Sequence, residues 1–416
     1  MNEKIIVLLI FVACYALALS RKVKLAYASL GASALLFVFG ILKFEDAIFK
    51  AIKWDVLGIY WGFMMVSFVF MKSRMPELMA NKILTKVKTE KYAILSLSAV
   101  TAFLSAFMEN VGVVLIMAPV AIAIAKKLNS SLFYYLIAIA ISSNVVTTVT
   151  MVADPPPIIL ALETGMKPLD FYWFQGRPGL GTLTIFGVIA AMLTLLVQFR
   201  KMNKRVDVIP ETVEVTKGAS ILFIGGVAAL FAAPGVGISV GIVGFAVGLI
   251  SLYMGRSDIK EMLFEFDWNS FLFIVGVFMV IFTLNASGLL KDFAGFIVDS
   301  GSKDPTFMLA FLTWISVVFS SFMDNVPYTI LMIPVCQHLA ELIGMSAWPL
   351  LYGMLVGTGT GGNITPVGAA ANVFACGILE KHGYKIILKE YLKIGVPFSV
   401  AAVATVHILL QIFWMR

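Results

Sequence analysis

Long apolar segments separated by short polar ones follow one another from one end of the chain to the other. Each is about 17 to 22 residues long, enough for a helix to cross roughly 30 Å of hydrocarbon. The pattern predicts spans at 4–20, 25–42, 54–71, 132–163 and 179–199, and a second set at 218–232, 237–253, 268–287, 347–380 and 394–415. No stretch remains for a separate soluble domain.

The second set repeats the first. Trp54 and Gly62 correspond to Trp268 and Gly276, 214 positions later. The segment SAFMENVGVVLIMAPV at 105–120 likewise matches SSFMDNVPYTILMIPV at 320–335. We therefore expect two repeats, residues 1–207 and 208–416.

Each repeat also holds an apolar segment that is too long for one crossing and is broken in its middle by an acid and an asparagine. A re-entrant hairpin explains these segments, at 91–128 and 306–342. Each repeat then crosses the membrane five times, and because five is odd the second repeat is inverted, as in many secondary transporters. The expected fold is an all-α polytopic membrane protein with two inverted-topology repeats, each with five transmembrane helices, the fourth broken, and one re-entrant hairpin.

Composition agrees with the span pattern. Hydrophobic residues make up 60% of the 416 positions and charged residues 13%, with a mean hydropathy of +0.96, whereas a soluble domain has roughly 25% charged residues. The three cysteines all lie in apolar sequence, which favours buried thiols over a disulfide framework. We expect an integral membrane protein with no nucleic-acid partner.

The distribution of charge predicts the orientation. Most of the 31 Lys and Arg residues fall in loops that share one side if the N-terminus is outside, and positive loops stay in the cytoplasm. This places both termini outside, with the first hairpin opening to the cytoplasm and the second to the exterior of the cell membrane. The net charge of +7 then reflects orientation.

The fourth helix of each repeat is interrupted, by SSNVVTTVTMVADPPPIIL at 142–160 and by GTGTGGNITPVGAAANVF at 357–374. Three prolines or clustered glycines cannot continue a regular helix. Irregular backbone at membrane depth survives only where protein or water satisfies its polar groups, so both breaks should line a cavity. The neutral candidate ligands there are Ser143, Asn144, Thr147, Thr148, Thr150, Thr358, Thr360, Asn363, Thr365 and Asn372.

The acidic candidates are Glu109, Asp324 and Asp154. A carboxylate at the membrane centre costs at least about 2.5–3.5 kcal/mol, which points to function. Helix capping is the alternative for Asn110 and Asn325 at the hairpin tips and for Asp154 before its prolines. The three histidines are scattered and suggest no metal site, whereas a sodium ion could use Asn110, Asn144, Asn325 and Asn363.

The hairpin tips and the stretch GGNITPVGAAANV at 361–373 resemble the ion transporter superfamily, in particular the branch of arsenite-efflux permeases, NhaD-type sodium/proton antiporters and the pink-eyed-dilution protein. The resemblance covers nearly the whole chain. It implies a secondary transporter rather than an enzyme, with an ATPase subunit as a separate partner if the chain is an arsenite permease. Dicarboxylate and citrate carriers of the superfamily have Ser-Asn-Thr at both tips, where this chain has Glu109-Asn110-Val111 and Asp324-Asn325-Val326.

Two buried acids without a buried base disfavour a dianionic substrate in a medium of low dielectric constant. Loss of contact with water also favours the neutral form of a carboxyl group, so the tip acids could exchange protons near neutral pH. We expect a proton-coupled antiporter that exports arsenite, antimonite or a similar oxyacid such as silicic acid. It would use a proton or sodium gradient and no cofactor.

Sodium/proton exchange is the alternative, and citrate or dicarboxylate symport ranks lower. An intramembrane aspartyl protease lacks support because its Gly-x-Gly-Asp signature is missing, and a passive channel remains a separate class. The expected partners are a small inorganic substrate, a coupling cation and the lipid bilayer. Homodimerisation is left open.

Overall fold

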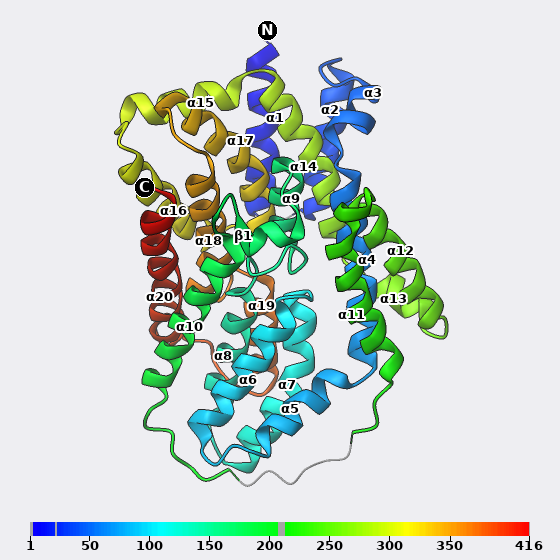
Figure 1. Cartoon of the computed structure of the whole chain (residues 1–416), viewed down its shortest axis with the longest axis vertical. Helices are drawn as coiled ribbons and strands as arrows, with labels where there is room; N and C mark the ends of the chain where they lie inside the picture. The colour runs from blue at the N-terminus through cyan, green and yellow to red at the C-terminus, as the bar shows by residue number, and fades with distance from the viewer. Residues whose placement is uncertain (1–2, 21–22, 207–212, 416) are drawn as a thin grey trace.

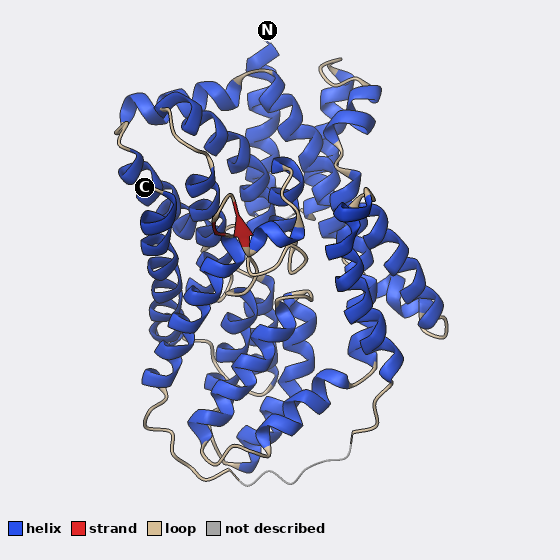
Figure 2. Ribbon diagram, viewed as in Figure 1, coloured by secondary structure: helices blue, strands red, loops and turns tan. Residues whose placement is uncertain are grey.

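The structure, a computed structural model, describes residues 3–20, 23–206 and 213–415. Helices make up most of this part, and its one sheet is a two-stranded ribbon of β1 (Trp173–Phe174) and β2 (Arg177–Pro178) (Figure 2). The all-helical class of the sequence prediction is therefore confirmed.

In the first half, a helix lies at each predicted segment (Figure 1). The helices are α1 (Glu3–Ser20), α2 (Leu25–Val38), α4 (Trp54–Lys72), α6 (Glu90–Ser105), α7 (Asn110–Lys127), α8 (Leu132–Asn144), α9 (Pro155–Thr164) and α10 (Leu180–Gln198). The break in the fourth helix separates α8 from α9, and the hairpin turn separates α6 from α7.

The second half follows the same order. Its helices are α11 (Lys217–Ala232), α12 (Val240–Met254), α14 (Trp268–Ala286), α16 (Pro305–Ser320), α17 (Asn325–Ile343), α18 (Trp348–Gly361), α19 (Ala370–Lys381) and α20 (Leu388–Trp414). The sequence pattern missed four short helices outside the apolar runs, α3 (Phe44–Asp46), α5 (Met75–Leu84), α13 (Ile259–Glu265) and α15 (Leu289–Ser300).

Seven helical segments in the described part are long and apolar enough to cross a membrane: α4, α7, α10, Lys217–Val236 (α11 with the turn after it), α14, α17 and α20. The helices α2, α8, α12 and α16 are apolar but shorter. The sequence had assigned one full crossing each to α2 and α12, and these two are shorter than the spans expected there, 25–42 and 237–253.

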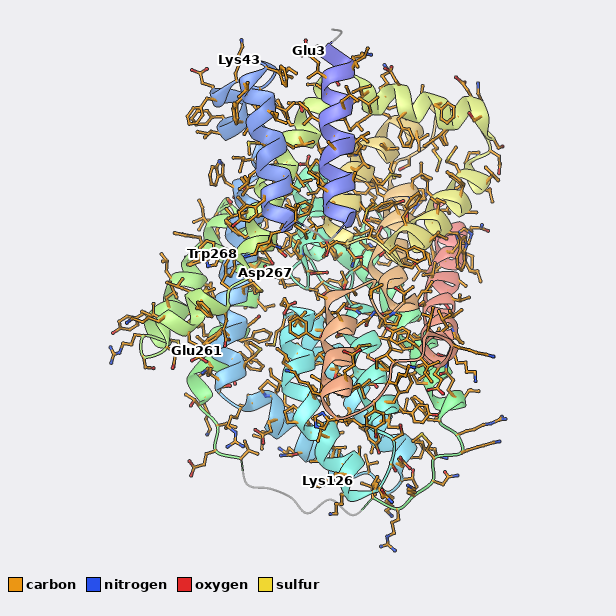
Figure 3. All side chains as sticks on the ribbon, turned by 180° about the vertical axis from the view of Figure 1, so that it is seen from behind. Glu3, Lys43, Lys126, Glu261, Asp267 and Trp268 are labelled. Atoms are coloured by element: carbon orange, nitrogen blue, oxygen red, sulfur yellow. The ribbon has the colours of Figure 1, made fainter. Side chains whose placement is uncertain are left out.

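The two hairpins lie in opposite halves of the molecule. Figure 1 shows α6 and α7 in the lower half and α16 and α17 in the upper half. Figure 3 shows Glu3 and Lys43 at one end and Lys126 at the other, whereas Asp267 lies near the middle. The polar tips of both hairpins therefore approach the interior from opposite ends.

The two halves are interleaved. Helix α4 packs against α12 of the other half, and the equivalent helices α14 and α2 also pack together. Glycine allows the close approach: a Cβ at Gly62 would strike the backbone carbonyl of Gly244, and one at the equivalent Gly276 would strike Ser29. Each half is thus held by a helix of the other.

We predict that Gly62→Ala lowers the melting temperature in detergent, because overpacking typically costs about 1–3 kcal/mol. Gly31 in α2 is the matched control, since a Cβ there would meet nothing within 4 Å. Gly31→Ala should leave the melting temperature unchanged or raise it. Equal melting temperatures for the two variants would contradict the close contact of α4 and α12.

Candidate functional site

A cavity of about 100 Å³ lies where the two hairpin turns meet the two breaks. Its wall contains the starts of six helices: α2, α7, α9, α14, α17 and α19. Further lining residues come from α4 and from the end of α8. The predicted tip residues Asn110 and Asn325, 215 positions apart in sequence, both line it.

Both tip acids act as helix caps. The Glu109 carboxylate accepts hydrogen bonds from the backbone N–H of Val111 at 3.0 Å and of Gly112 at 2.7 Å. The Asp324 carboxylate accepts one from the N–H of Val326 at 3.0 Å. A negative charge at a helix N-terminus is stabilised by the helix dipole, so both acids have a structural role in addition to lining the cavity.

The tip asparagines differ in their bonding. Asn325 Oδ1 accepts a hydrogen bond from Ser320 Oγ at 2.7 Å. Asn110 Nδ2 donates to Thr147 Oγ1 at 3.3 Å, while Asn110 Oδ1 is buried and has no partner in the described part of the chain. Since Asn110 is only 8% exposed, one end of its amide is buried without a hydrogen bond in the described part of the chain.

The asparagines of the two breaks bind each other. Asn144 Nδ2 donates to Asn363 Oδ1 at 2.9 Å and to Asn372 Oδ1 at 3.1 Å. Asn363 Nδ2 donates to the Ile141 carbonyl, and Asn372 Nδ2 donates to the carbonyls of Gly362 and Thr365. These amides join the two broken helices, and only Asn144 of the three also lines the cavity.

The predicted hydroxyl ligands mostly hold backbone in place. Thr150 donates to the carbonyl of Ala106, and the equivalent Thr365 donates to the carbonyl of Ser321 at 2.5 Å, so each break is tied to its own hairpin turn. Three other predicted hydroxyls also bond to protein: Ser143 to Ala140, Thr148 to Thr184 and Thr358 to Met354.

Of the predicted site residues, the cavity therefore brings together Glu109, Asn110, Asn144, Asp154, Asp324 and Asn325. Its wall does not include Ser143, Thr147, Thr148, Thr150, Thr358, Thr360, Asn363, Thr365 or Asn372. Of the four asparagines proposed for sodium, three line the cavity and Asn363 does not. Within the described ranges, no group of three or more His, Cys, Asp or Glu side chains is suited to a metal ion.

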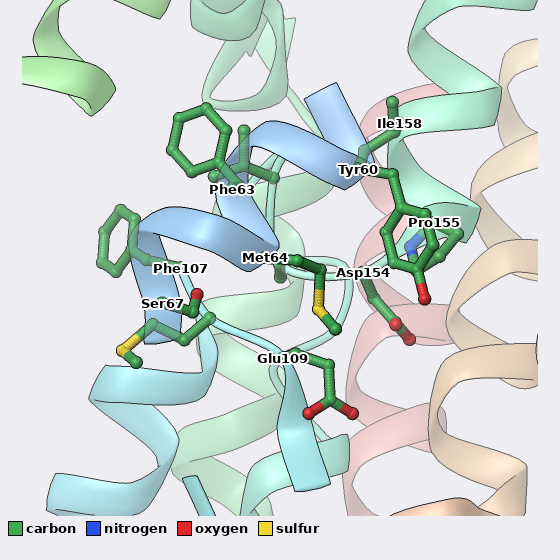
Figure 4. A pocket seen from close by; sticks show the side chains of 12 residues that line it. Tyr60, Phe63, Met64, Ser67, Phe107, Glu109, Asp154, Pro155 and Ile158 are labelled. Atoms are coloured by element: carbon green, nitrogen blue, oxygen red, sulfur yellow. The ribbon is translucent and has the colours of Figure 1, made fainter. Parts of the chain in front are cut away.

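Asp154 differs from the other acids of the cavity in forming no hydrogen bond within the described part of the chain. It makes no cap bond to α9, because positions 155–157 are proline and have no N–H to donate. The alternative interpretation of Asp154 as a cap is therefore wrong. Figure 4 shows Tyr60, Glu109 and Asp154 directed toward one space, which they line together.

Sequence reasoning missed Asp267 and Tyr60, which also line the cavity. Asp267 caps α14 by accepting a hydrogen bond from the N–H of Ser270 at 3.0 Å. The equivalent position in the first half holds Lys53, which pairs with Glu163 at 3.2 Å. The sequence did contain a signal for Asp267: it is an acid at a position where the other repeat has a base, Lys53.

The described wall of the cavity thus carries four acids, Glu109, Asp154, Asp267 and Asp324, and no Lys, Arg or His. Two wider cavities share lining residues with it. One of about 620 Å³ includes Glu109 and Asp267, and one of about 360 Å³ includes Asp324.

A helical membrane protein with a polar cavity between broken helices and hairpins has the architecture of a secondary transporter. The family described as citrate transporter, CitMHS, matches residues 15–357, and the chain belongs to this family of the ion transporter superfamily. It is therefore a transporter and not an enzyme.

Individual relatives agree. An uncharacterized transporter of Mycobacterium tuberculosis is 26% identical over 99% of this chain and 98% of its own length. The P protein of Mus musculus is 25% identical over 89% of this chain and 55% of its own length. The predicted resemblance to the superfamily and to the pink-eyed-dilution protein is thus confirmed. These relatives do not identify the substrate.

MtrF of Neisseria gonorrhoeae, described as illuminating a class of antimetabolite efflux pumps, has a similar solved structure. The TM-score is 0.58 at 11% identity, over 92% of this chain and 84% of MtrF. At this identity the similarity shows the fold alone.

We predict that Glu109→Ala lowers the free energy of unfolding by about 1–2 kcal/mol, because two N–H groups of α7 lose their cap. Asp154→Asn should leave stability equal or higher, since it removes a half-buried carboxyl group that caps no helix. Melting curves in detergent measure both. A loss for Asp154→Asn as large as for Glu109→Ala would contradict the different roles.

Proposed function

We propose that this protein is a proton-coupled secondary active transporter that binds its solute and its coupling proton in the central cavity. The observation that carries the proposal is the environment of Asp154: a carboxyl group in the cavity that caps no helix and accepts no hydrogen bond in the described part of the chain. An acid at membrane depth without a structural role is expected to serve transport.

The surroundings of Asp154 favour its neutral form. The start of α9 offers no N–H groups, and Glu109 and Asp324 line the same cavity. Like charges at short range disfavour ionisation. Asp154 would therefore take up a proton when the cavity closes and release it when water enters.

The proposed solute is a neutral metalloid hydroxide such as arsenous, antimonous or silicic acid, because the four acids of the cavity would repel an anion. Exchange of this solute for protons would make the protein an exporter. Sodium/proton exchange is the alternative, with Asn110, Asn144 and Asn325 as sodium ligands. A carboxylate such as citrate is a second candidate, favoured by the description of the family. The N–H groups of Ala370 and Ala371 at the cavity wall, which have no partner within the described part of the chain, also favour it.

The interleaved packing of equivalent helices supports two inverted repeats, with residues 1–207 and 208–416 as the units. Alternating access would then open the first hairpin to the cytoplasm and the second to the exterior of the cell membrane. Both termini would lie outside.

We predict that Asp154→Asn abolishes gradient-driven transport in proteoliposomes. A screen of arsenite, antimonite, silicate, citrate, succinate, sodium and lithium under an imposed pH gradient first identifies the solute. Loss of coupling should then reduce accumulation by about tenfold or more, within the usual range of coupling energies. Asp299→Asn, at an exposed position of α15 outside the cavity, is the control. Normal accumulation by Asp154→Asn would contradict the assignment.

The orientation has its own test. Single cysteines at the exposed positions Lys82 and Lys201 should react with an impermeant thiol reagent from the cytoplasm, and one at the exposed Lys303 should react from outside. Lys204 is avoided because its ammonium group donates to the end of α7. Reaction of all three from one face would show that the repeats are not inverted.

A further inference from the structure

We propose that the cavity of about 620 Å³, beside the central cavity, is a binding site for an amphipathic organic cation. Such a ligand carries one positive charge on a bulky apolar body. The inference goes beyond the proposed function, because this ligand is not the carried solute and would obstruct the route to the central cavity.

The cavity follows one face of α4. Six residues of this helix line it: Tyr60, Met64, Met65, Ser67, Phe68 and Met71. All except Met65 share a face by their helical spacing, and the opposite face, with Gly58 and Gly62, packs on α12. Eleven residues of helix span roughly 16 Å. The space is therefore elongated, from the centre of the molecule to the last turn of α4.

The charge of the wall favours a cation. Glu109, Glu265 and Asp267 line the cavity, and its described wall holds no Lys, Arg or His. The base that follows Met71 in the chain, Lys72, pairs with Glu261 at 2.7 Å. Acids without a base attract a positive ligand and repel an anion.

Aromatic rings lie in the same wall as the acids. The rings of Tyr60 and Phe266 both line the cavity, with their centroids 6.1 Å apart and tilted by 51°. The face of an aromatic ring attracts a cation within about 6 Å, and organic ammonium groups are recognised in this way. Rings combined with acids are suited to a weakly hydrated organic cation rather than to a hydrated metal ion.

The rest of the wall is suited to an apolar body. Four methionines line it: Met64, Met65, Met71 and Met262. Methionine is flexible and polarisable, and it adapts to ligands of different shape. The volume of about 620 Å³ lies within the range of roughly 300–1,000 Å³ that is common for sites of organic ligands.

Ser67 is an independent sign of a ligand. It is only 4% exposed and lines the cavity, and its hydroxyl forms no hydrogen bond within the described part of the chain. A buried polar group left unpaired is destabilising. A ligand with an ammonium group could donate a hydrogen bond to the Ser67 oxygen, since a hydroxyl accepts as well as donates.

The repeat shows that this chemistry occurs in one half only. At the equivalent positions, 214 residues away, Ile274 replaces Tyr60 and Lys53 replaces Asp267. The glycines that hold the two halves together recur in both repeats, whereas the ring and the acid do not. The cation site is therefore not a by-product of the shared scaffold.

Occupation of this site would affect transport. Tyr60, Glu109 and Asp267 line both this cavity and the central cavity. A ligand whose positive group lies at these residues stands between the central cavity and the wider one. We expect it to inhibit transport.

Two ions of the same shape and opposite charge test the site. Tetraphenylphosphonium and tetraphenylborate are added to the purified full-length protein in detergent, and binding is measured as the rise in melting temperature. We expect the phosphonium to stabilise the wild type and the borate to have no such effect.

The double variant Glu265→Gln/Asp267→Asn removes two charges of the wall. Asparagine caps a helix about as well as aspartate, so α14 keeps its cap. We expect this variant to bind the phosphonium about tenfold more weakly, as for charges roughly 10 Å apart near a protein surface. The matched control is Glu380→Gln/Asp299→Asn, the same changes at exposed positions outside the cavity.

A second variant tests the aromatic contribution. Tyr60→Leu should weaken binding of the phosphonium by about fivefold, within the usual range for a ring that contacts a cation. The charge variant alone decides the test if Tyr60→Leu does not fold, because Glu265 and Asp267 are exposed.

Equal stabilisation by the two ions, or none by the phosphonium, would overturn the proposal. Equal affinity of the charge variant and its control would overturn it as well. Charge-dependent binding of the phosphonium to a protein that moves no protons would leave this site standing and refute the proton coupling instead. The two proposals therefore fail in distinguishable ways.

Discussion

Backbone polar groups at membrane depth must find partners, and in this protein that requirement determines the architecture of the centre. The two hairpin turns and the two helix breaks leave N–H and C=O groups that lipid cannot satisfy. Thr150 and Thr365 bond to the turns at Ala106 and Ser321, and the amides of Asn144, Asn363 and Asn372 join the breaks to each other. With the breaks secured in this way, the helix starts can face a cavity.

Because the two halves are similar, the positions at which they differ are informative. Threonine bonds that secure the turns occur in both halves, as expected for structural parts. The acids Asp154 and Asp267 each occur in one half only, and so do the N–H groups of Ala370 and Ala371, which have no partner within the described part of the chain. We interpret the shared features as support for the cavity and the unshared features as its chemistry. On this interpretation the coupling proton binds to the half that carries Asp154.

Sequence patterning predicted the main helices, the hairpins and both breaks, because length, apolarity and Pro or Gly placement determine them locally. It missed α5 and α15, which are short and only partly apolar. It also proposed threonines as ligands, and in the structure Thr150 and Thr365 bond to the hairpin turns and do not line the cavity. Their partners, such as Ala106 for Thr150, are defined by tertiary packing. Asp267 was overlooked because it lies just before a predicted span, where acids are common. Only the fold shows that this position lies at the cavity.

The central claim is that proton and solute movements are coupled through the cavity. The most direct measurement records internal pH in proteoliposomes after a gradient of the identified solute is applied without any pH gradient. The account predicts that the solute gradient alone drives protons across the membrane, and that Asp154→Asn abolishes this proton movement. Solute flux in the wild type with no change in internal pH would contradict it.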